Sequence, residues 1–243
     1  MNAKPHDAKP HDPNRMTFLE HLEELRWRLL KTVSAIAATT LLAFVFHQSL
    51  VTWLLKPAGG IELIFTAPAE YFMVTLRVAF FAGLYLSLPV LLYQLIAFVA
   101  PGLTSAERRW TFPMLAAAFL LFTGGALFSY FFLLPVALKF LLGFAPQGIA
   151  PLLSIGNYLS FSASLVFATG LVFELPLVLF FLSLMGLVTS AKLKHFRRYF
   201  LIVALIVAAI VTPSPDIFTQ GILGMALMGL YELSILLIQG IKR

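Results

Sequence analysis

The stretch from Trp110 to Leu138 reads WTFPMLAAAFLLFTGGALFSYFFLLPVAL and contains no charged side chain. A bilayer has a hydrocarbon core about 30 Å thick, and a helix that rises about 1.5 Å per residue crosses it with about 20 apolar residues. Three further stretches of similar length also lack charge: Thr32–Leu55, Val78–Ala106 and Phe140–Phe173. These stretches predict an all-α, polytopic integral membrane protein.

The basic residues lie mostly in alternate segments between the apolar stretches. Fourteen of the 17 Lys and Arg residues fall in these segments: Lys4, Lys9, Arg15, Arg26, Arg28, Lys31, Arg108, Arg109, Lys192, Lys194, Arg197, Arg198, Lys242 and Arg243. The positive-inside rule assigns such segments to the cytoplasm. The pattern predicts six transmembrane helices with both termini inside, over about residues 29–50, 72–99, 111–134, 158–184, 199–212 and 217–238.

The last two spans are predicted to be short. The fifth apolar run, Phe200–Val211, has twelve residues, and such a run rises only about 18 Å as a helix. Two arrangements remain open, namely short helices in a locally thinned bilayer or a re-entrant hairpin. Both leave the C-terminus on the inside.

The chain divides into a polar tail, residues 1–17, and a transmembrane domain, residues 18–243. The tail repeats AKPHD at Ala3–Asp7 and Ala8–Asp12. His and Asp side chains can bind metal ions, but a polar, proline-containing segment is more typical of disorder. We therefore predict a disordered cytoplasmic tail and no metal site.

The composition also limits the classes of function. Hydrophobic residues make up 60% of the chain and charged residues 12%, against about 25% charged in globular proteins. The net charge of +6 comes from cations at helix ends, so it indicates topology and contact with anionic lipids rather than nucleic acid. There is no cysteine, which excludes disulfides and thiolate ligands. We expect no cleavable signal and no Arg- and Ser-rich transit sequence, which favours a bacterial inner membrane.

Enzyme signatures are missing from the sequence. His21 is followed by Leu22 rather than Glu, so the metalloprotease helix motif is not formed. Asp216 is the only aspartate near the spans, which excludes a two-aspartate intramembrane protease, and the serines of the spans have no histidine nearby. No glycine-rich phosphate loop occurs. We therefore predict no catalytic residue and no cofactor.

Glu174 is the most costly residue of the chain, because it lies in an apolar span far from any cation in the sequence. Burial of a carboxylate costs several kcal/mol unless it is protonated, hydrated or paired. We interpret Glu174, with Pro176 beside it, as an intramembrane functional site. The alternative is a neutral carboxyl group that is hydrogen-bonded to a neighbouring helix.

Two prolines and one arginine are expected to have structural roles. Pro57 lies in the first outer loop, and Pro89 lies inside the second span, where it usually kinks a helix. Arg77 lies near the outer end of that span, seven residues after Glu70. It can extend toward the headgroups or pair with Glu70.

Carboxylates also occur on the inner face, where the positive-inside rule favours only cations. Glu24 lies close to Arg26 and Arg28, and Glu107 is followed by Arg108. Surface ion pairing within each cluster is one interpretation, worth less than about 1 kcal/mol per pair. The other is a receptor for a basic peptide.

These segments together resemble the TatC family, the polytopic component of the twin-arginine (Tat) protein export system. The resemblance extends from Phe18 to about Gln239. The matching motifs are Phe18–Leu29 (FLEHLEELRWRL), Pro68–Phe72 (PAEYF), Pro89–Gln94 (PVLLYQ) through Phe98, Pro101–Leu103 (PGL) with Glu107–Arg109 (ERR), Phe173–Pro176 (FELP), Thr212–Asp216 (TPSPD) and Tyr231–Glu232 (YE). Their order and topology together carry the resemblance.

The resemblance implies a signal-peptide receptor that moves folded proteins with the proton motive force. In the family, signal peptides bind at positions that match Glu24, Glu107, Arg26, Phe98 and Arg108, while Glu174 faces a concave lipid-facing groove. The single-span partners, TatA-like and TatB-like proteins, would lie near positions that match Asp216, Gln220 and Glu232. An oligomeric complex is expected.

The rival interpretation is a proton-coupled secondary transporter with Glu174 as its ion site. Such a transporter typically has internal repeats and discontinuous helices that meet in mid-membrane. The two halves of the chain have no convincing similarity. The sequence therefore favours the export receptor.

Overall fold

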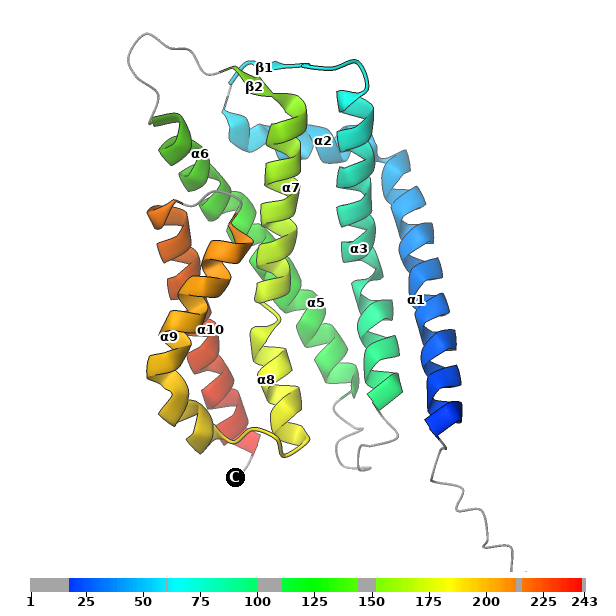
Figure 1. Ribbon diagram of the computed structural model, residues 1–243, viewed down its shortest axis with the longest axis vertical. Helices are drawn as coiled ribbons and strands as arrows, with labels where there is room; N and C mark the ends of the chain where they lie inside the picture. Colours follow the sequence, from blue (N-terminus) through cyan, green and yellow to red (C-terminus); the bar gives the residue numbers. More distant parts are fainter. Residues whose placement is uncertain (1–17, 60, 100–110, 144–151, 213–215, 242–243) are drawn as a thin grey trace, which may run out of the picture.

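The computed structural model describes residues 18–59, 61–99, 111–143, 152–212 and 216–241, and these are almost entirely helical (Figure 1). The helices are α1 (Phe18–Val45), α2 (His47–Leu55), α3 (Glu70–Val99), α5 (Thr111–Phe128), α6 (Leu134–Gly143), α7 (Ile155–Val172), α8 (Leu175–Leu184), α9 (Ser190–Val211) and α10 (Ile217–Ile241). Two short strands, β1 (Leu63–Ile64) and β2 (Leu153–Ser154), pair in parallel. We use "lower end" for the end of the bundle where α1 begins in Figure 1, and "upper end" for the opposite one.

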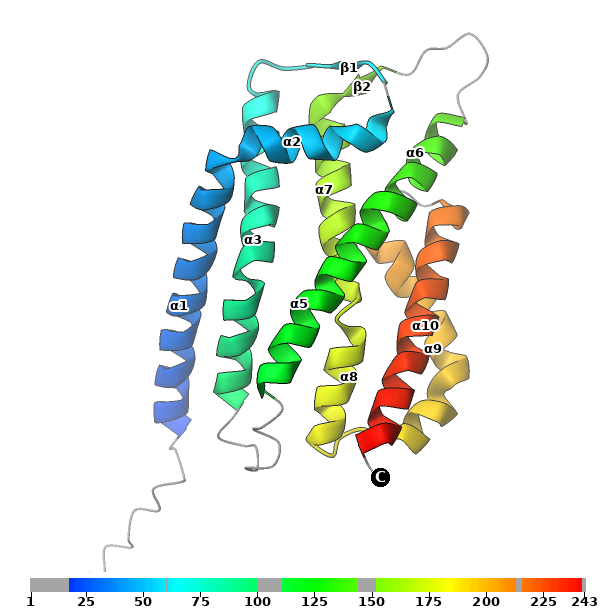
Figure 2. The same ribbon diagram turned by 180° about the vertical axis from the view of Figure 1, so that it is seen from behind.

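The first predicted span is divided into two helices. The helix begins at Phe18, where the apolar residues Phe18, Leu22, Leu25 and Leu29 recur with helical spacing, but α1 ends at Val45 rather than near Leu50. After a turn at Phe46, α2 lies across the upper end of the bundle, beside α3 and α7 (Figure 2). Burial of Val51 and Leu54 on the inner face of α2 stabilises this crossing helix.

The third helical segment is longer than the predicted span, which ended at residue 134. A π-helical turn (Ser129–Leu133) follows α5, and α6 continues to Gly143. The helix therefore passes through Pro135 and continues beyond the predicted end of the span. Proline removes one helical hydrogen bond, but burial of Leu134 and Ala137 in the bundle stabilises the helix that contains it.

The fourth predicted span consists of two helices with a break between them. The N-cap of α7 is Ser154, whose side chain accepts a hydrogen bond from the Asn157 N–H at 3.2 Å. The regular helix is interrupted by a turn at Phe173 and Glu174, just before Pro176 at the start of α8. A proline in the first turn of a helix is tolerated because its missing N–H has no helical partner there.

The basic segment from Thr189 to Arg198, which lies between the fourth and fifth predicted spans, is helical after its first residue. Thr189 caps α9 by accepting a hydrogen bond from the Lys192 N–H at 3.3 Å. The last two helices have 22 and 25 residues, so the prediction that both are short is wrong for their helical length. Only the apolar part of α9, Phe200–Val211, is short.

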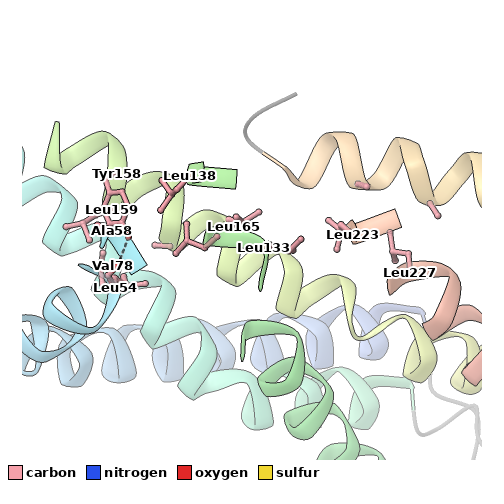
Figure 3. Packing of buried hydrophobic residues seen from close by; sticks show 14 of the residues in the cluster. Leu54, Ala58, Val78, Leu133, Leu138, Tyr158, Leu159, Leu165, Leu223 and Leu227 are labelled. Atoms are coloured by element: carbon pink, nitrogen blue, oxygen red, sulfur yellow. Dashed lines mark hydrogen bonds between the residues drawn. The ribbon is translucent and has the colours of Figure 1, made fainter. Parts of the chain in front are cut away.

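The core has contributions from both halves of the bundle. Leu54 of α2, Val78 of α3 and Leu159 of α7 are buried together, and the Tyr158 hydroxyl donates to the Leu54 carbonyl at 2.8 Å (Figure 3). The helices α1 and α3 also pack closely. A Cβ added at Gly83 would lie 2.3 Å from the Thr40 hydroxyl oxygen, in keeping with the small residues that allow membrane helices to approach one another.

The outer surface of the bundle is apolar over most of its length. Large hydrophobic side chains remain exposed on several helices, among them Phe112, Ile210 and Ile217 at about 80% exposure. Five helical segments are long and apolar enough to cross a membrane: Leu19–Val45, Glu70–Phe98, Phe112–Gly143, Ile155–Leu184 and Ile217–Gly240. The prediction of an all-α, multi-pass membrane protein agrees with this surface. The helix α9, with four basic residues at its beginning, is not among the five.

Candidate functional site

Glu24 lies in α1 near the lower end and is held by a neighbouring arginine. Its Oε1 accepts hydrogen bonds from Arg28 Nε at 2.8 Å and from Arg28 Nη2 at 2.5 Å. The remaining arm of Arg28 donates to Gln94 of α3 at 3.2 Å. Because Glu24 and Arg28 are four residues apart, they lie on one face of the helix, and Gln94 fixes that face against α3.

The second oxygen of Glu24 is buried but unpaired. Within the part of the chain that the structure describes, Glu24 Oε2 has no hydrogen-bond partner, and His21 Nδ1 lies 3.8 Å from it. The His21 ring stacks on Phe98, with 4.2 Å between the ring centroids. The site is therefore a partly buried carboxylate beside an aromatic pair, with one oxygen bound to Arg28 and one oxygen buried without a described hydrogen-bond partner.

The structure brings together part of the predicted binding site. Glu24 and Phe98 lie near one another through His21, whereas the Arg26 side chain is exposed. Glu107 and Arg108 lie outside the described residues.

Two members of this cluster were missed from the sequence, His21 and Gln94, whereas an ion pair of Glu24 within its cluster was one of the two interpretations and is formed with Arg28. The spacing of four residues between Glu24 and Arg28 was a usable signal, since such pairs interact on a helix. Nothing in the local sequence pointed to Gln94, which reaches Arg28 from 66 residues away.

Glu174 lies at the break between α7 and α8. It occupies the N-cap position of α8 without a side-chain capping bond, and it is only 6% exposed. Neither carboxyl oxygen has a hydrogen-bond partner among residues with assigned positions. The alternative of a carboxyl group hydrogen-bonded to a neighbouring helix is therefore not supported. Pro176 is buried and lines an apolar groove of about 520 Å³ with Met114 of α5 and Leu236 of α10.

The three residues that were predicted to contact partner proteins all make contacts within the α9–α10 hairpin. Asp216 is buried and accepts a hydrogen bond from the Thr219 N–H at 2.6 Å, which caps α10. Gln220 donates to the Leu205 carbonyl at 3.1 Å. Glu232 pairs with Arg197 at 2.6 Å, with both side chains more than 40% exposed. The hairpin is thus tied together at both ends.

The predicted structural prolines lie in different settings. Pro57 lies in a 3₁₀ turn (Lys56–Ala58) that ends at Gly59, where φ is +61°. Pro89 lies inside α3, which continues past it to Val99.

The upper end contains a polar network around Glu70. Its carboxylate accepts from the Thr66 N–H and hydroxyl at 2.6 Å each, from the Ala67 N–H at 3.2 Å and from the Gly156 N–H at 2.7 Å. Ser154 also donates to it. Arg77 instead donates to Ser160 at 2.8 Å, and the described residues contain no ion pair between Arg77 and Glu70. The suggested pairing of the two is therefore wrong.

Residues 20–225 match the family of Sec-independent protein translocase proteins, TatC. A TatC protein of Aquifex aeolicus is 40% identical over 228 residues, which cover 91% of this chain and 94% of that protein. The chain belongs to the TatC family. A TatC protein of Synechocystis sp. is 37% identical, with 90% and 87% covered. A chloroplastic TATC protein of Arabidopsis thaliana is 41% identical over 222 residues, and the chain spans 65% of its length.

Solved structures of TatC agree with this membership. A crystal structure described as the twin-arginine translocase receptor TatC in DDM matches with a TM-score of 0.80 at 39% identity, covering 90% of this chain and 99% of that one. A second crystal structure of the receptor matches with a TM-score of 0.77 at 40% identity. The predicted family and the predicted place in the Sec-independent translocase are confirmed. TatC proteins are multi-pass membrane subunits of a protein translocase and not known enzymes, and chloroplast relatives exist beside bacterial ones.

Proposed function

We propose that this chain is a receptor for signal peptides that carry paired arginines, and that it acts in the export of folded proteins. The observation that carries the proposal is the Oε2 of Glu24, which has no described hydrogen-bond partner while Oε1 is held by Arg28. A guanidinium group forms short, directional hydrogen bonds with a carboxylate. Because Arg28 and Gln94 already fix Glu24, a peptide arginine loses little freedom of the receptor side chain on binding.

The second arginine of the peptide is assigned to Glu107, with Arg26, Phe98 and Arg108 around the site. The crystal structures described as twin-arginine translocase receptors support a receptor role for the chain through their similarity to it. Phe98 and its stacked His21 offer an apolar surface for the residues that flank the two arginines.

The proposed topology has six membrane helices, with both termini in the cytoplasm of a bacterial inner membrane. Support comes from the basic beginning of α9, which lies at the same lower end as Arg26 and Arg28 of α1 (Figure 1). The chain has no cysteine, so single cysteines can be labelled without background. Cysteine at Ala191 should be protected from an impermeant thiol reagent in intact cells, and cysteine at Gly60 should react. Labelling of the cysteine introduced at Ala191 would contradict the proposed topology.

Partners and energy source complete the proposal. TatA-like and TatB-like single-span proteins would bind along α9 and α10, in an oligomeric complex driven by the proton motive force. The exposed apolar side chains of both helices, such as Ile210 and Met225, are available to such membrane helices. A transporter function would rest on Glu174 alone, since the described residues contain no second unpaired carboxyl group beside it, and we do not propose it.

The decisive experiment is peptide binding to the purified chain. Each lost charge-assisted hydrogen bond costs about 1.5–3 kcal/mol, or roughly ten- to a hundredfold in affinity. Glu24→Ala and Glu107→Ala should each weaken binding of an Arg-Arg peptide by this factor. A Lys-Lys peptide should lose much less, because lysine lacks the planar fork of arginine.

The matched control is Glu23→Ala, since Glu23 is exposed next to Glu24. It should leave the affinity nearly unchanged. Equal losses for the Arg-Arg and Lys-Lys peptides would mean that the carboxylates only attract positive charge. Unchanged binding in a Glu24/Glu107 double variant would refute the proposed site.

A further inference from the structure

A polar cavity of about 240 Å³ lies at the upper end, between the first turns of α3 and α7. Its polar lining comes from six residues of the two helices and the segments before them: Thr66, Glu70, Arg77, Ser154, Asn157 and Ser160. None of these residues belongs to the proposed peptide site, which lies at the lower end. The cavity therefore needs a separate explanation.

The one cation of this cavity, Arg77, forms no ion pair within the described residues, although the Glu70 carboxylate belongs to the same lining. The Glu70 carboxylate is already engaged by five donors from Thr66, Ala67, Ser154 and Gly156. The guanidinium group of Arg77 donates one hydrogen bond, to the neutral Ser160 hydroxyl at 2.8 Å. A guanidinium group has five N–H donors, so most of its donor capacity remains available toward the cavity.

The position of Arg77 in the helix determines which anion can reach it. It follows Glu70 by seven residues, or roughly 10 Å along the helix axis. Its neighbours Met73 and Phe80 are 61% and 45% exposed, as expected for side chains that face lipid. The anion present in quantity near this level of a membrane is the phosphate group of phospholipids, and arginine binds phosphate with two parallel hydrogen bonds.

We propose that Arg77, together with Ser160 and the exposed Asn157, binds the phosphate group of a membrane phospholipid. The Ser160 hydroxyl holds the guanidinium group, and the Asn157 amide adds a donor from the first turn of α7. The acyl chains lie along the apolar face of α3 formed by Met73 and Phe80. In the proposed topology this is a lipid of the outer leaflet, but the site itself does not depend on the receptor function.

Native mass spectrometry of the detergent-purified full chain tests the proposal. Phosphatidylglycerol should remain bound at concentrations where diacylglycerol with the same acyl chains does not. Arg77→Gln should weaken phosphatidylglycerol binding about tenfold, which corresponds to about 1.4 kcal/mol. Lys56→Gln removes another exposed cation of the upper end and should leave binding unchanged.

A second variant and competing ligands distinguish the possible outcomes. Ser160→Ala retains the cation and should lose about threefold, which gives a second measurement if Arg77→Gln does not fold. Equal retention of phosphatidylglycerol and diacylglycerol would mean that water alone solvates Arg77, and would overturn the proposal. Displacement of the lipid by an equal concentration of inorganic phosphate would assign the site to free phosphate and overturn the lipid source. Peptide binding at the lower end should be unaffected throughout.

Discussion

Two glutamates of this membrane bundle, Glu70 and Glu174, have opposite surroundings. Glu70 begins α3 and accepts hydrogen bonds from five donors, whereas Glu174 begins α8 and has no hydrogen-bond partner among the positioned residues. Both residues stand at the beginning of a helix. The difference is that Glu70 meets the polar backbone of the upper loops, while Glu174 is enclosed by apolar helices.

The comparison separates a structural carboxylate from a functional one. Glu70 joins the segment before α3 to the beginning of α7, so its removal should affect folding. Glu174 contributes no described hydrogen bond, and an unpartnered buried carboxyl group lowers the stability of the folded state. A residue that lowers the stability of the fold and makes no described hydrogen bond is a candidate for a functional role.

The largest effect on stability is expected for Glu70→Ala, because five N–H or hydroxyl groups lose their acceptor and the upper loops lose their common anchor. The unfolding temperature in detergent should fall more than for any other variant considered below. Glu70→Gln should give an intermediate loss. Glu62→Ala, which removes an exposed carboxylate of the same loop, serves as control and should change little. Similar unfolding temperatures for Glu62→Ala and Glu70→Ala would contradict the structural role of Glu70.

A second test acts on Glu70 from the opposite helix. A Cβ at Gly156 would lie 2.5 Å from Glu70 Oε1 and 2.6 Å from its Cγ, so Gly156→Ala should displace the carboxylate. We expect a loss of about 1–3 kcal/mol, the usual cost of overpacking. In Gly229→Ala the new Cβ meets nothing within 4 Å, and the change should stabilise α10 by up to about 1 kcal/mol. Thermal unfolding of both variants with the same sign would contradict this account.

Glu174→Gln should have little effect on folding and a large effect on export. The side chain keeps its size and loses no described hydrogen bond, so the unfolding temperature should not fall by more than about 2 °C, equivalent to roughly 0.5 kcal/mol for a chain of this size. Export of a folded reporter protein should be impaired while Arg-Arg peptide binding persists. Loss of the folded protein from detergent extracts would instead assign Glu174 to packing.

The smallest effect is expected for the Arg197–Glu232 pair. Both side chains are more than 40% exposed, and exposed pairs contribute less than about 1 kcal/mol. Glu232→Gln and Arg197→Gln should each lower the unfolding temperature slightly. Their double variant should equal either single one if the pair is the only contribution. A loss well above about 1 kcal/mol in either single variant would mean that the pair is important for holding α9 against α10.

Much of the fold could be predicted because apolar length and charge are local properties. The beginning of α1 at Phe18 follows from its amphipathic spacing, and the extent of α3 follows from the charge-free stretch after Arg77. The break at Phe46 could not be predicted, because no glycine or proline marks it and burial of α2 against α3 and α7 stabilises it. The continuation through Pro135 likewise depends on packing of α6.

The candidate site was predictable to a similar degree. Glu24 and Glu174 were recognised because a carboxylate in an apolar or basic context is rare. Their states were not, since these depend on partners that come from other helices. Arg28, which also donates to Gln94, occupies one oxygen of Glu24, and no described group occupies those of Glu174.

The sequence by itself determined that the chain is a helical membrane protein of the TatC family and where its unusual charges lie. These features follow from composition, spacing and motif order along the chain. Only the tertiary structure decided which charges are satisfied. The bonds from Ser154 and Gly156 to Glu70 join residues 84 and 86 positions apart, and such contacts form only when distant helices pack side by side. Local patterns place a charge at a helix end, but the neighbouring helices determine whether it stabilises the fold or remains available to a ligand.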